Sequence, residues 1–428
     1  MKRRDFLRNA SLMGALPAAV AAQSARRSGG GLQGGLQPLN GGKIGNTGAM
    51  KITDIKTFLI GAGGRNWLYV KVLTDQGLFG IGEAYSAGPD EATVKVIEDF
   101  KLWLVGQDPR NVQYLFDILY NTTRFPGGII TNSAISGIEH ALWDLAGKSA
   151  GLPVWALLGG RVRNKIRTYQ SIGGGTAQEA GESAKKMVEK YGYTALKMGI
   201  MAPGDMPQNQ ALRLSTERVR AVREAVGPDI DIGVDIHTKF VEVERAMRLA
   251  QALEPYQIMW LEEPIRPENF AAMKKLSDHV KVPLASGESN YMIHEFRPLI
   301  DQQAVDFVQP DICCCGGVLT MKKIAAMAEA MYIRVAPHNP MSPLATAVNA
   351  HFAASTPNFH ILEYHAPDTS PWKDVLKEPL MVQKDGYIEI PNKPGWGVEL
   401  NEEAFKSMPP QPWRRGTNFR KDGSVYFQ

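Results

Sequence analysis

The sequence predicts an α/β protein in which a parallel (β/α) barrel follows a smaller α+β domain. Two observations support this prediction. From about residue 166 to residue 390, strand-like and helix-like segments alternate along the chain. Between residues 51 and 165, strand-like segments come first and a helical stretch follows, which is typical of an α+β domain.

The predicted α+β domain begins with strands at 51–60 and 66–84. A Thr-Asp-Gln-Gly turn divides the second segment into a hairpin, so three strands are expected. Apolar residues then recur at helical spacing through 138–150, which predicts a helix near the end of this domain.

The predicted barrel has eight strand candidates with helical patterns between them. The strands are expected at 166–173, 194–200, 231–237, 258–264, 283–289, 306–312, 332–339 and 359–365. The clearest helical patterns lie at 215–227, 243–254 and 320–331. Residues 391–428 lose the alternation, and we expect this tail to pack back on the α+β domain.

The first 25 residues are similar to a twin-arginine export signal. Arg3 and Arg4 precede Phe-Leu, and a moderately apolar stretch ends in small residues that suit cleavage near Ala22 or Ala25. Residues 26–50 are rich in glycine and are expected to form a flexible linker. We therefore expect a periplasmic protein exported by this route, the alternative being a basic N-terminus that arose by chance.

The bulk composition excludes two classes of function. The net charge is +4, of which residues 1–22 contribute +3, so no basic surface for nucleic acid is expected. No long apolar run follows the leader, so no integral membrane domain is expected. The three cysteines, Cys313, Cys314 and Cys315, are adjacent, and we interpret them as reduced, buried thiols beside the active site.

Three acidic residues end successive strand candidates. Asp235, Glu262 and Glu288 are 27 and 26 residues apart, which is about the length of one strand with its return helix. The carboxyl ends of barrel strands gather at one rim, where three carboxylates repel one another unless a cation lies between them. We expect these residues to bind Mg²⁺, whereas the neighbouring Glu263 points the other way and supports the site structurally.

A divalent cation suggests chemistry at the carbon beside a carboxylate. A cation bound to a substrate carboxylate stabilises the enediolate that forms when the α-proton is removed. His338 ends the seventh strand candidate in the motif APHN and is the expected general base. Asp311 ends the neighbouring strand candidate and is expected to orient His338 and raise its basicity.

Three further residues are candidates for the same rim. His237 follows Asp235 by two residues, so we expect both side chains on one side of the strand, with a protonated His237 available to expel hydroxide. Glu363 ends the last strand and, if protonated, is expected to donate to the enediolate, the alternative being an ion pair with a lysine. Lys197 is expected to contact the substrate carboxylate, the alternative being a surface lysine.

These residues in this order resemble the enolase superfamily, mandelate racemase branch, and within it the galactonate dehydratase subgroup. The resemblance runs from MKITDIKT at 50–57 almost to the C-terminus. It includes SAISGIEHALWDLAGK at 133–148, LEEP at 261–264, APHNPMSPLA at 336–345 and KPGWGVE at 393–399. It implies a modified (β/α)7β TIM barrel with a capping α+β domain, and commonly a homo-oligomer.

The resemblance implies a sugar-acid dehydratase that uses Mg²⁺ on Asp235, Glu262 and Glu288 and forms a 2-keto-3-deoxy acid from an aldonate or aldarate. It also implies the His338–Asp311 base pair, His237 as the acid and Glu363 near the enediolate. Racemase-like members carry Lys-x-Lys on the second strand, and Gly199 stands at the second of these positions. Alternatives are a racemase, epimerase or cycloisomerase that uses the same enolisation, or a non-catalytic sugar-acid-binding protein.

Two regions depart from the subgroup. The stretch CCCGG at 313–317 replaces a more polar segment, and the loops at 61–67 and 85–93, which close over the substrate in this family, do not match closely. Since those loops determine the substrate in this family, the particular sugar acid is left open.

Overall fold

The structure is a computed structural model that describes residues 48–86, 88–200, 206–412 and 418–426. The expected export signal at 1–25 lies outside the described residues, as does the expected linker up to residue 47. Among the helices within these ranges, none combines the length and the apolar character needed to cross a membrane.

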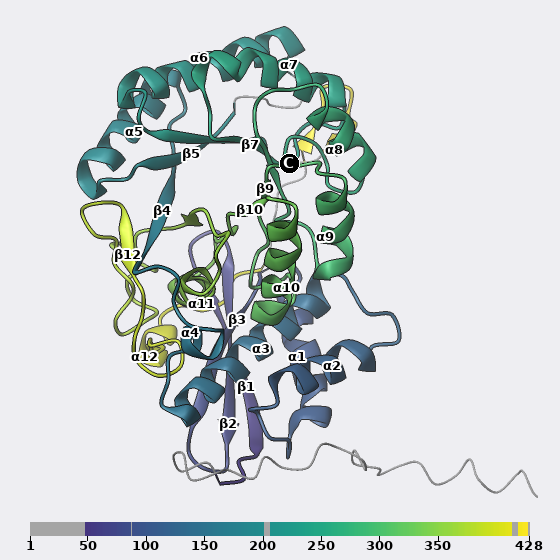
Figure 1. Ribbon diagram of the computed structural model, residues 1–428, viewed down its shortest axis with the longest axis vertical. Coiled ribbons are helices and arrows are strands. Elements are labelled where there is room, and N and C mark those ends of the chain that lie inside the picture. The colour runs from purple at the N-terminus through teal and green to yellow at the C-terminus, as the bar shows by residue number, and fades with distance from the viewer. Residues whose placement is uncertain (1–47, 87, 201–205, 413–417, 427–428) are drawn as a thin grey trace, which may run out of the picture. The chain divides into compact units, whose positions relative to one another are not determined.

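The N-terminal part, called the cap here, is an antiparallel sheet covered by helices (Figure 1). The sheet has the order β1-β2-β3, with bounds Ile52–Gly61, Asn66–Thr74 and Phe79–Ala84. The helices are α1 (Asp90–Leu104), α2 (Val112–Thr122) and α3 (Ile129–Ala150). The three expected strands and the expected helix are present.

Strand β3 and helix α3 lie unusually close together. A Cβ atom at Gly80 would collide with the backbone of Ala141, and one at Gly82 would collide with the backbone of Gly137. Only glycine leaves room for this approach. Helix α3 is therefore pressed directly against the sheet, and most of its residues are buried.

Eight parallel strands form the barrel, in the order β10-β9-β8-β7-β6-β5-β4-β11. Their bounds are Lys165–Ile172 (β4), Ala195–Gly199 (β5), Asp231–Asp235 (β6), Trp260–Glu262 (β7), Leu284–Ser286 (β8), Phe307–Val308 (β9), Arg334–Val335 (β10) and Leu362–Glu363 (β11). A parallel bridge between Val335 and Phe359 links β10 to the segment that leads into β11. Each strand lies within a segment that the sequence pattern predicts, except that β4 begins one residue earlier, at Lys165, so the α/β class is confirmed.

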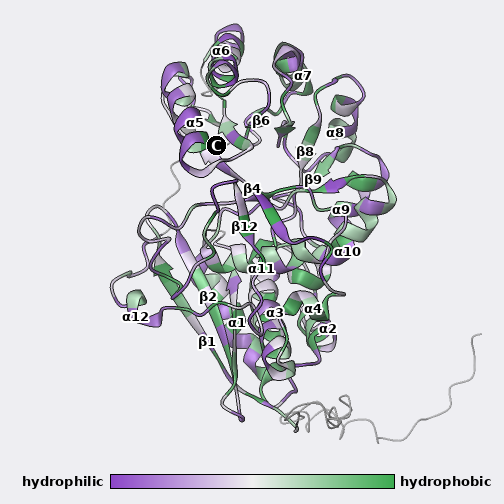
Figure 2. Ribbon diagram, turned by 60° about the vertical axis from the view of Figure 1, so that its left-hand side comes forward, coloured by the Kyte–Doolittle hydropathy of each residue, from purple (hydrophilic) through white to green (hydrophobic). Residues whose placement is uncertain are grey.

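Helices surround the barrel strands, and most of them show hydrophilic residues (Figure 2), whereas the last of them, Pro343–Ala354, is buried throughout. Their bounds are Ala177–Tyr191 (α5), Gln208–Val226 (α6), Val243–Leu253 (α7), Phe270–Ser277 (α8), Met292–Asp301 (α9), Gly317–Ala330 (α10) and Pro343–Ala354 (α11). Short elements complete the description: α4 (Val154–Leu157), a 3-10 helix (Glu254–Tyr256), β12 (Tyr387–Glu389), α12 (Glu402–Phe405), β13 (Asn418–Phe419) and β14 (Val425–Tyr426).

The C-terminal segment contacts the cap. The backbone N–H of Trp396 donates to Asp144 of α3 at 2.9 Å, and its indole N–H lies 3.1 Å from the carbonyl oxygens of Ile81 and His140. Further along, the carbonyl of Met408 accepts a hydrogen bond from the N–H of Gly61 at 3.0 Å. A buried tryptophan thus fixes this segment against both β3 and α3.

Candidate metal centre and acid-base site

Three carboxylates converge at the carboxyl ends of adjacent barrel strands. Asp235 is the last residue of β6, Glu262 is the last residue of β7, and these two are paired in register. Glu288 follows the end of β8 by two residues. One oxygen from each side chain lies within 4.8 Å of the others, so the three form a group able to hold a metal ion. We call this group the carboxylate triad.

The donor set and its electrostatics suit a hard divalent cation. All three side chains offer oxygen ligands, and Asp235 and Glu262 are fully buried. Burial raises the pKa of Asp235 to about 6, with Lys197 opposing the shift and Glu288 adding to it. The buried Oδ2 atom of Asp235 accepts no well-formed hydrogen bond, although Lys197 Nζ and His237 Nε2 lie 3.4 and 3.1 Å from it. A cation between these oxygens would interact with this atom and offset the repulsion among the three carboxylates.

Neighbouring side chains fix the orientation of Glu262. Its Oε2 atom accepts from the indole N–H of Trp260 at 2.8 Å and from the amide of Gln309 at 2.9 Å, while Oε1 accepts from Lys197 Nζ at 2.7 Å. Gln309 follows the end of β9 by one residue. Such contacts hold a ligand oxygen in place before a metal binds.

Lys197 lies among the carboxylates. It is only 5% exposed, and its Nζ atom lies 2.7 Å from Glu262, 2.9 Å from Glu363 and 3.4 Å from Asp235. Burial opposes its charge, but these carboxylates outweigh burial and hold the pKa of Lys197 well above its usual value. The surface-lysine alternative is therefore wrong, whereas contact with the substrate carboxylate stays a prediction.

Glu363 forms an ion pair with a lysine, which is the alternative expected for this residue from the sequence. Its Oε1 atom contacts Lys197, and its Oε2 atom accepts from the backbone N–H of Asn339 at 2.9 Å. Burial acts to raise the pKa of Glu363, yet Lys197 and then His338 outweigh it and lower that pKa well below the usual range. This arrangement matches the ion-pair alternative, because an ionised carboxylate balances the lysine charge, and donation by Glu363 to the enediolate stays a prediction.

The expected base pair is assembled. The Nδ1 atom of His338 lies 2.9 Å from Oδ2 of Asp311, and a parallel bridge joins the two residues. Burial acts to lower the pKa of His338, but Glu288 and the hydrogen bond to Asp311 outweigh it and raise that pKa to about 10. The other ring nitrogen, Nε2, lies 3.6 Å from Glu288 and therefore faces the triad.

His237 lies beside the triad, but not for the reason expected. Strand β6 ends at Asp235, and His237 has a φ of +53°, so alternation along a strand does not apply to it. Its Nε2 atom nevertheless lies 3.1 Å from Oδ2 of Asp235, and half of its side chain is exposed. Desolvation lowers the pKa of His237, and its role as the proton donor stays a prediction.

Glu263 supports the turn that carries Glu288. Its carboxylate accepts from the hydroxyl of Ser286 at 2.7 Å and from the N–H of Gly287 at 2.8 Å. Its φ of +42° turns the chain out of β7 and directs this side chain away from the line of the strand. The structural role expected for Glu263 agrees with these contacts.

The three cysteines form a tight turn after Asp311. Cys313 donates its N–H to Oδ1 of Asp311 at 2.8 Å, and the N–H groups of Cys314 and Cys315 donate to the Asp311 carbonyl at 3.1 and 2.8 Å. All three thiols are free and buried, as expected, and burial raises their pKa values well above the usual range. The turn uses backbone N–H groups to orient Asp311, and the thiols take no part.

Two cap residues reach the site, and the sequence patterns do not single them out. The ring of Tyr85, which follows β3, lies 6.4 Å from the ring of His338, and its N–H donates to the carbonyl of Cys313. The guanidinium of Arg65, in the turn between β1 and β2, lies 3.5 Å from the Pro340 carbonyl. Both belong to the two loops that the resemblance expects over the substrate.

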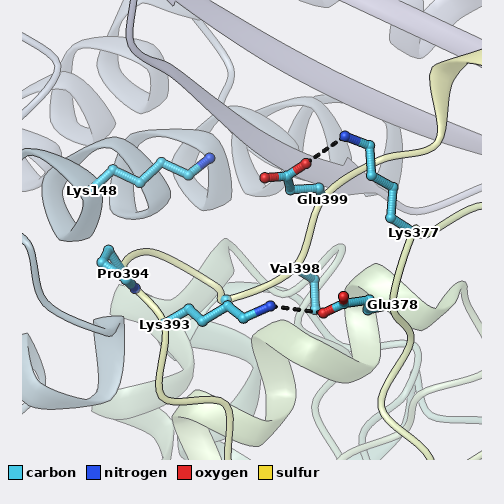
Figure 3. A pocket seen from close by; sticks show the side chains of 8 residues that line it. Lys148, Lys377, Glu378, Lys393, Pro394, Val398 and Glu399 are labelled. Carbon is cyan, nitrogen blue, oxygen red and sulfur yellow. Dashed lines mark hydrogen bonds and ion pairs between the residues drawn. The ribbon is translucent and has the colours of Figure 1, made fainter.

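A separate cavity of about 360 Å³ opens between α3 and the C-terminal segment (Figure 3). Its lysines are paired: Lys148 with Asp144 at 2.6 Å, Lys377 with Glu399 at 2.7 Å and Lys393 with Glu378 at 2.7 Å. It shares no residue with the triad. Because its charges balance, this cavity offers no evident site for a substrate carboxylate.

The fold and the site define a capped (β/α) barrel whose carboxylate triad and Asp–His pair share one rim. The chain belongs to the enolase superfamily, in its mandelate racemase and muconate lactonizing enzyme group. Residues 53–159 match the mandelate racemase / muconate lactonizing enzyme N-terminal domain, and residues 179–404 match the enolase C-terminal domain-like family. The resemblance in the sequence is therefore confirmed.

Curated relatives cover most of the chain. A D-xylonate dehydratase of Haloferax volcanii is 37% identical over 370 residues, which is 83% of this chain and 88% of that protein. A D-galactonate dehydratase of Pectobacterium atrosepticum is 33% identical over 384 residues, which is 88% of this chain and 99% of that protein.

Solved structures agree with the fold. An enolase from Agrobacterium radiobacter, bound to Na and L-malate, has a TM-score of 0.85 and 37% identity, and the match covers 88% of this chain and 100% of that one. A mandelate racemase/muconate lactonizing enzyme-like protein from Roseovarius has a TM-score of 0.79 and 34% identity, covering 88% and 98%.

Proposed function

We propose that this chain is a Mg²⁺-dependent dehydratase of a sugar acid, an aldonate or aldarate, and that it yields a 2-keto-3-deoxy acid. The observation that carries the proposal is the placement of two histidines against different members of the triad. His338 lies 3.6 Å from Glu288, and His237 lies 3.1 Å from Asp235. Elimination of water needs one group to take a proton and a second group to give one.

Asp235, Glu262 and Glu288 would hold the metal ion. Bound there, Mg²⁺ supplies positive charge beside the substrate carboxylate, which makes the proton on the adjacent carbon more acidic. Lys197 then keeps the remaining charges of Glu262 and Glu363 balanced. A site of three carboxylates suits Mg²⁺ because this ion prefers oxygen ligands and keeps positions for water and substrate.

The proton transfers balance between the two histidines. With a cation at the triad offsetting the Glu288 charge that raises the pKa of His338, this histidine would be neutral; its Nε2 then takes the proton from carbon 2, while Asp311 stabilises the imidazolium through Nδ1. His237 donates a proton to the hydroxyl on carbon 3, which leaves as water as its C–O bond breaks. The resulting enol becomes the 2-keto acid when carbon 3 gains a proton. An anionic substrate beside His237 raises its pKa and so favours the protonated form needed for this step.

The relatives support a small hydroxy acid as the substrate. Two of them are named as dehydratases of D-xylonate and D-galactonate. A structural relative binds L-malate, a hydroxy acid, together with a cation. Arg65 and Tyr85 from the cap stand at the same rim and are candidates to contact the far end of the substrate.

A panel of hexonates, pentonates and hexarates with Mg²⁺ tests this function through the formation of 2-keto acid. We expect turnover of at least one acid, and loss of it when Mg²⁺ is chelated. In His237→Asn, exchange of the α-proton with D₂O should continue while 2-keto acid formation stops. Product formation at the parent rate would contradict the role of His237, and absence of turnover with Mg²⁺ bound would favour a binding protein.

We also propose that the chain is exported to the periplasm and assembles as a homo-oligomer. The Arg3-Arg4 pair and the following apolar stretch support export by the twin-arginine route. Replacing both arginines by lysine should stop export of a fused reporter, and continued export would contradict the proposal. Light scattering of the full-length chain should give a multiple of its 47.0 kDa mass, and a value equal to that mass would contradict assembly.

A further inference from the structure

The first turn of helix α10 is hydrogen-bonded to a carboxylate of the cap. Gly316, which precedes the helix, makes no side-chain hydrogen bond to its first turn, where the N–H groups of Val318 and Leu319 lie. Glu139 of α3 accepts both, at 3.0 and 2.9 Å, and is only 1% exposed. The fit is close, because a Cβ atom at Gly317 would collide with the Glu139 carboxylate. A buried carboxylate at this position also suits the positive end of the helix dipole.

Helix α11 begins in the same way. Glu83 of β3 is fully buried and accepts from the N–H and the hydroxyl of Ser342, at 3.0 and 2.5 Å. The same carboxylate accepts from the N–H of Ala345 at 3.0 Å. The side chain of Ser342 accepts a hydrogen bond from the N–H of Leu344 at the start of α11, so Glu83 fixes the residue that begins this helix. In each of these two barrel helices, a glutamate of the cap therefore accepts hydrogen bonds from N–H groups at the start of the helix.

These two helices are the ones that directly follow the base pair. Asp311 precedes the start of α10 at Gly317 by six residues, and His338 precedes the start of α11 at Pro343 by five. Connections this short transmit a displacement of the helix start to the residue before it. Small displacements matter here, because general-base catalysis depends on sub-ångström geometry.

Helix α3 also holds the segment between Asp311 and α10. The hydroxyl of Ser136 accepts from the N–H of Gly316 at 3.1 Å. The Nε2 atom of His140 lies 3.1 Å from the carbonyl of Ile312. One face of α3 thus contacts the Asp311 turn at its beginning, at its end and at the first turn of the following helix.

We propose that Glu83 and Glu139 are positioning residues for the His338–Asp311 pair, acting through the first turns of α11 and α10. The proposal rests on the proposed function, in which this pair takes the α-proton. Neither glutamate touches the triad or the ring of His338 in the contacts described above. Through them, the position of the cap on the barrel influences the geometry of the His338–Asp311 pair.

The test compares Glu139→Gln and Glu83→Gln with a matched control, Asp144→Asn. An amide keeps the shape of the carboxylate but turns an NH₂ group toward a backbone N–H, so it loses hydrogen bonds. Asp144 is also buried on α3 and also accepts backbone N–H groups, those of Ile81 and Trp396 at 2.9 Å, but it holds no barrel helix. All three variants should lose free energy of unfolding, and only the glutamate variants should disturb the base pair.

The decisive readout is the Nδ1–H resonance of His338 in Mg²⁺-loaded, ¹⁵N-histidine-labelled protein. It is assigned among the eight histidines by its absence in His338→Asn. In both glutamate variants we expect its exchange with solvent to be about tenfold faster or more, because the segment opens more readily. Asp144→Asn should leave it unchanged. Unchanged exchange in the glutamate variants, with destabilisation equal to the control, would overturn the proposal.

Two milder variants keep the test usable if the glutamate variants do not fold. Trp143→Phe removes the 2.8 Å hydrogen bond from the indole to Glu139, and Ser342→Ala removes the hydroxyl bond to Glu83. Each should accelerate the same exchange, by a smaller factor. With D-galactonate as a probe, α-proton exchange should slow about tenfold at unchanged Mg²⁺ affinity. If the parent turns over no acid, the proposed function fails, while the resonance still decides the positioning role.

Discussion

The amide of Gln309 donates a 2.9 Å hydrogen bond to Oε2 of Glu262, so the end of β9 orients a metal-ligand candidate on β7. Gln309 is 1% exposed, and the indole of Trp260 contacts the same oxygen. Glu262 is therefore held from two sides before any cation binds.

Replacing Gln309 by leucine should weaken Mg²⁺ binding. Loss of a hydrogen bond that orients a metal ligand typically lowers metal affinity about 10- to 100-fold. Isothermal titration calorimetry measures this directly. Gln251→Leu, on the exposed face of α7, is the control and should bind Mg²⁺ as the parent does. An affinity of Gln309→Leu within about twofold of the parent would show that Trp260 and Lys197 suffice to orient Glu262.

Lys197→Met should destabilise the metal-free protein more than the metal-loaded one. The substitution leaves Glu262 and Glu363 buried without their cation, a change that typically costs about 3–5 kcal/mol. Mg²⁺ at the triad would replace part of the lost positive charge. Urea unfolding in EDTA and in saturating Mg²⁺ gives the two free energies. Equal losses under both conditions would contradict a shared electrostatic role for Lys197 and the metal.

The dependence of stability on pH should change in Glu139→Gln. Burial raises the pKa of Glu139 from 4.5 to about 7. A carboxyl with a raised pKa in the folded state contributes full stability below its unfolded pKa, and that contribution is lost as the pH rises through the folded value. Relative to Glu139→Gln, which does not ionise, the parent should lose roughly 2–3 kcal/mol of unfolding free energy between pH 5 and pH 8.

Denaturant unfolding at several pH values measures this difference. Glu182→Gln, an exposed glutamate on α5, serves as the control, and its curve should run parallel to that of the parent. Parallel curves for the parent and Glu139→Gln would mean that Glu139 is already ionised in the folded protein at pH 5.

The three cysteines should be inert until the protein unfolds. Their thiols are fully buried, and burial raises their pKa values well above the usual range, so the reactive thiolate is scarce. A thiol reagent such as DTNB should label none in the native protein and three per chain after unfolding. Rapid labelling of Cys314 in the native state would show that the turn after Asp311 opens readily.

Much of the catalytic rim could be predicted from spacing. Asp235, Glu262, Glu288, Asp311 and His338 each follow a short apolar run at an interval that suits one strand and one helix, and parallel strands gather such residues at one end. His237 shows the limit of this reasoning. Its neighbourhood was inferred from alternation along a strand, but the strand ends at Asp235 and the positive φ of His237 sets its direction.

The rest of the site could not be predicted because it comes from the cap. Glu83 and Glu139 lie in ordinary strand and helix patterns, where a glutamate is usually solvent-exposed. Their partners are backbone N–H groups more than 170 residues away in the sequence, at Val318 and Ser342. Protonation states were also beyond reach, because the ionised state of Glu363 depends on Lys197, whose position among the carboxylates emerges only from the closed barrel.

The close contact of β3 with α3 has a consequence for engineering. Gly80 and Gly82 join this strand and helix into one rigid body, which carries both Glu83 and Glu139. A designer who grafts the cap of a relative, in order to exchange the loops around Arg65 and Tyr85, would also exchange the two carboxylates on which α10 and α11 begin. Chimeras should therefore keep β3 and α3 with the recipient barrel and transplant only the loops.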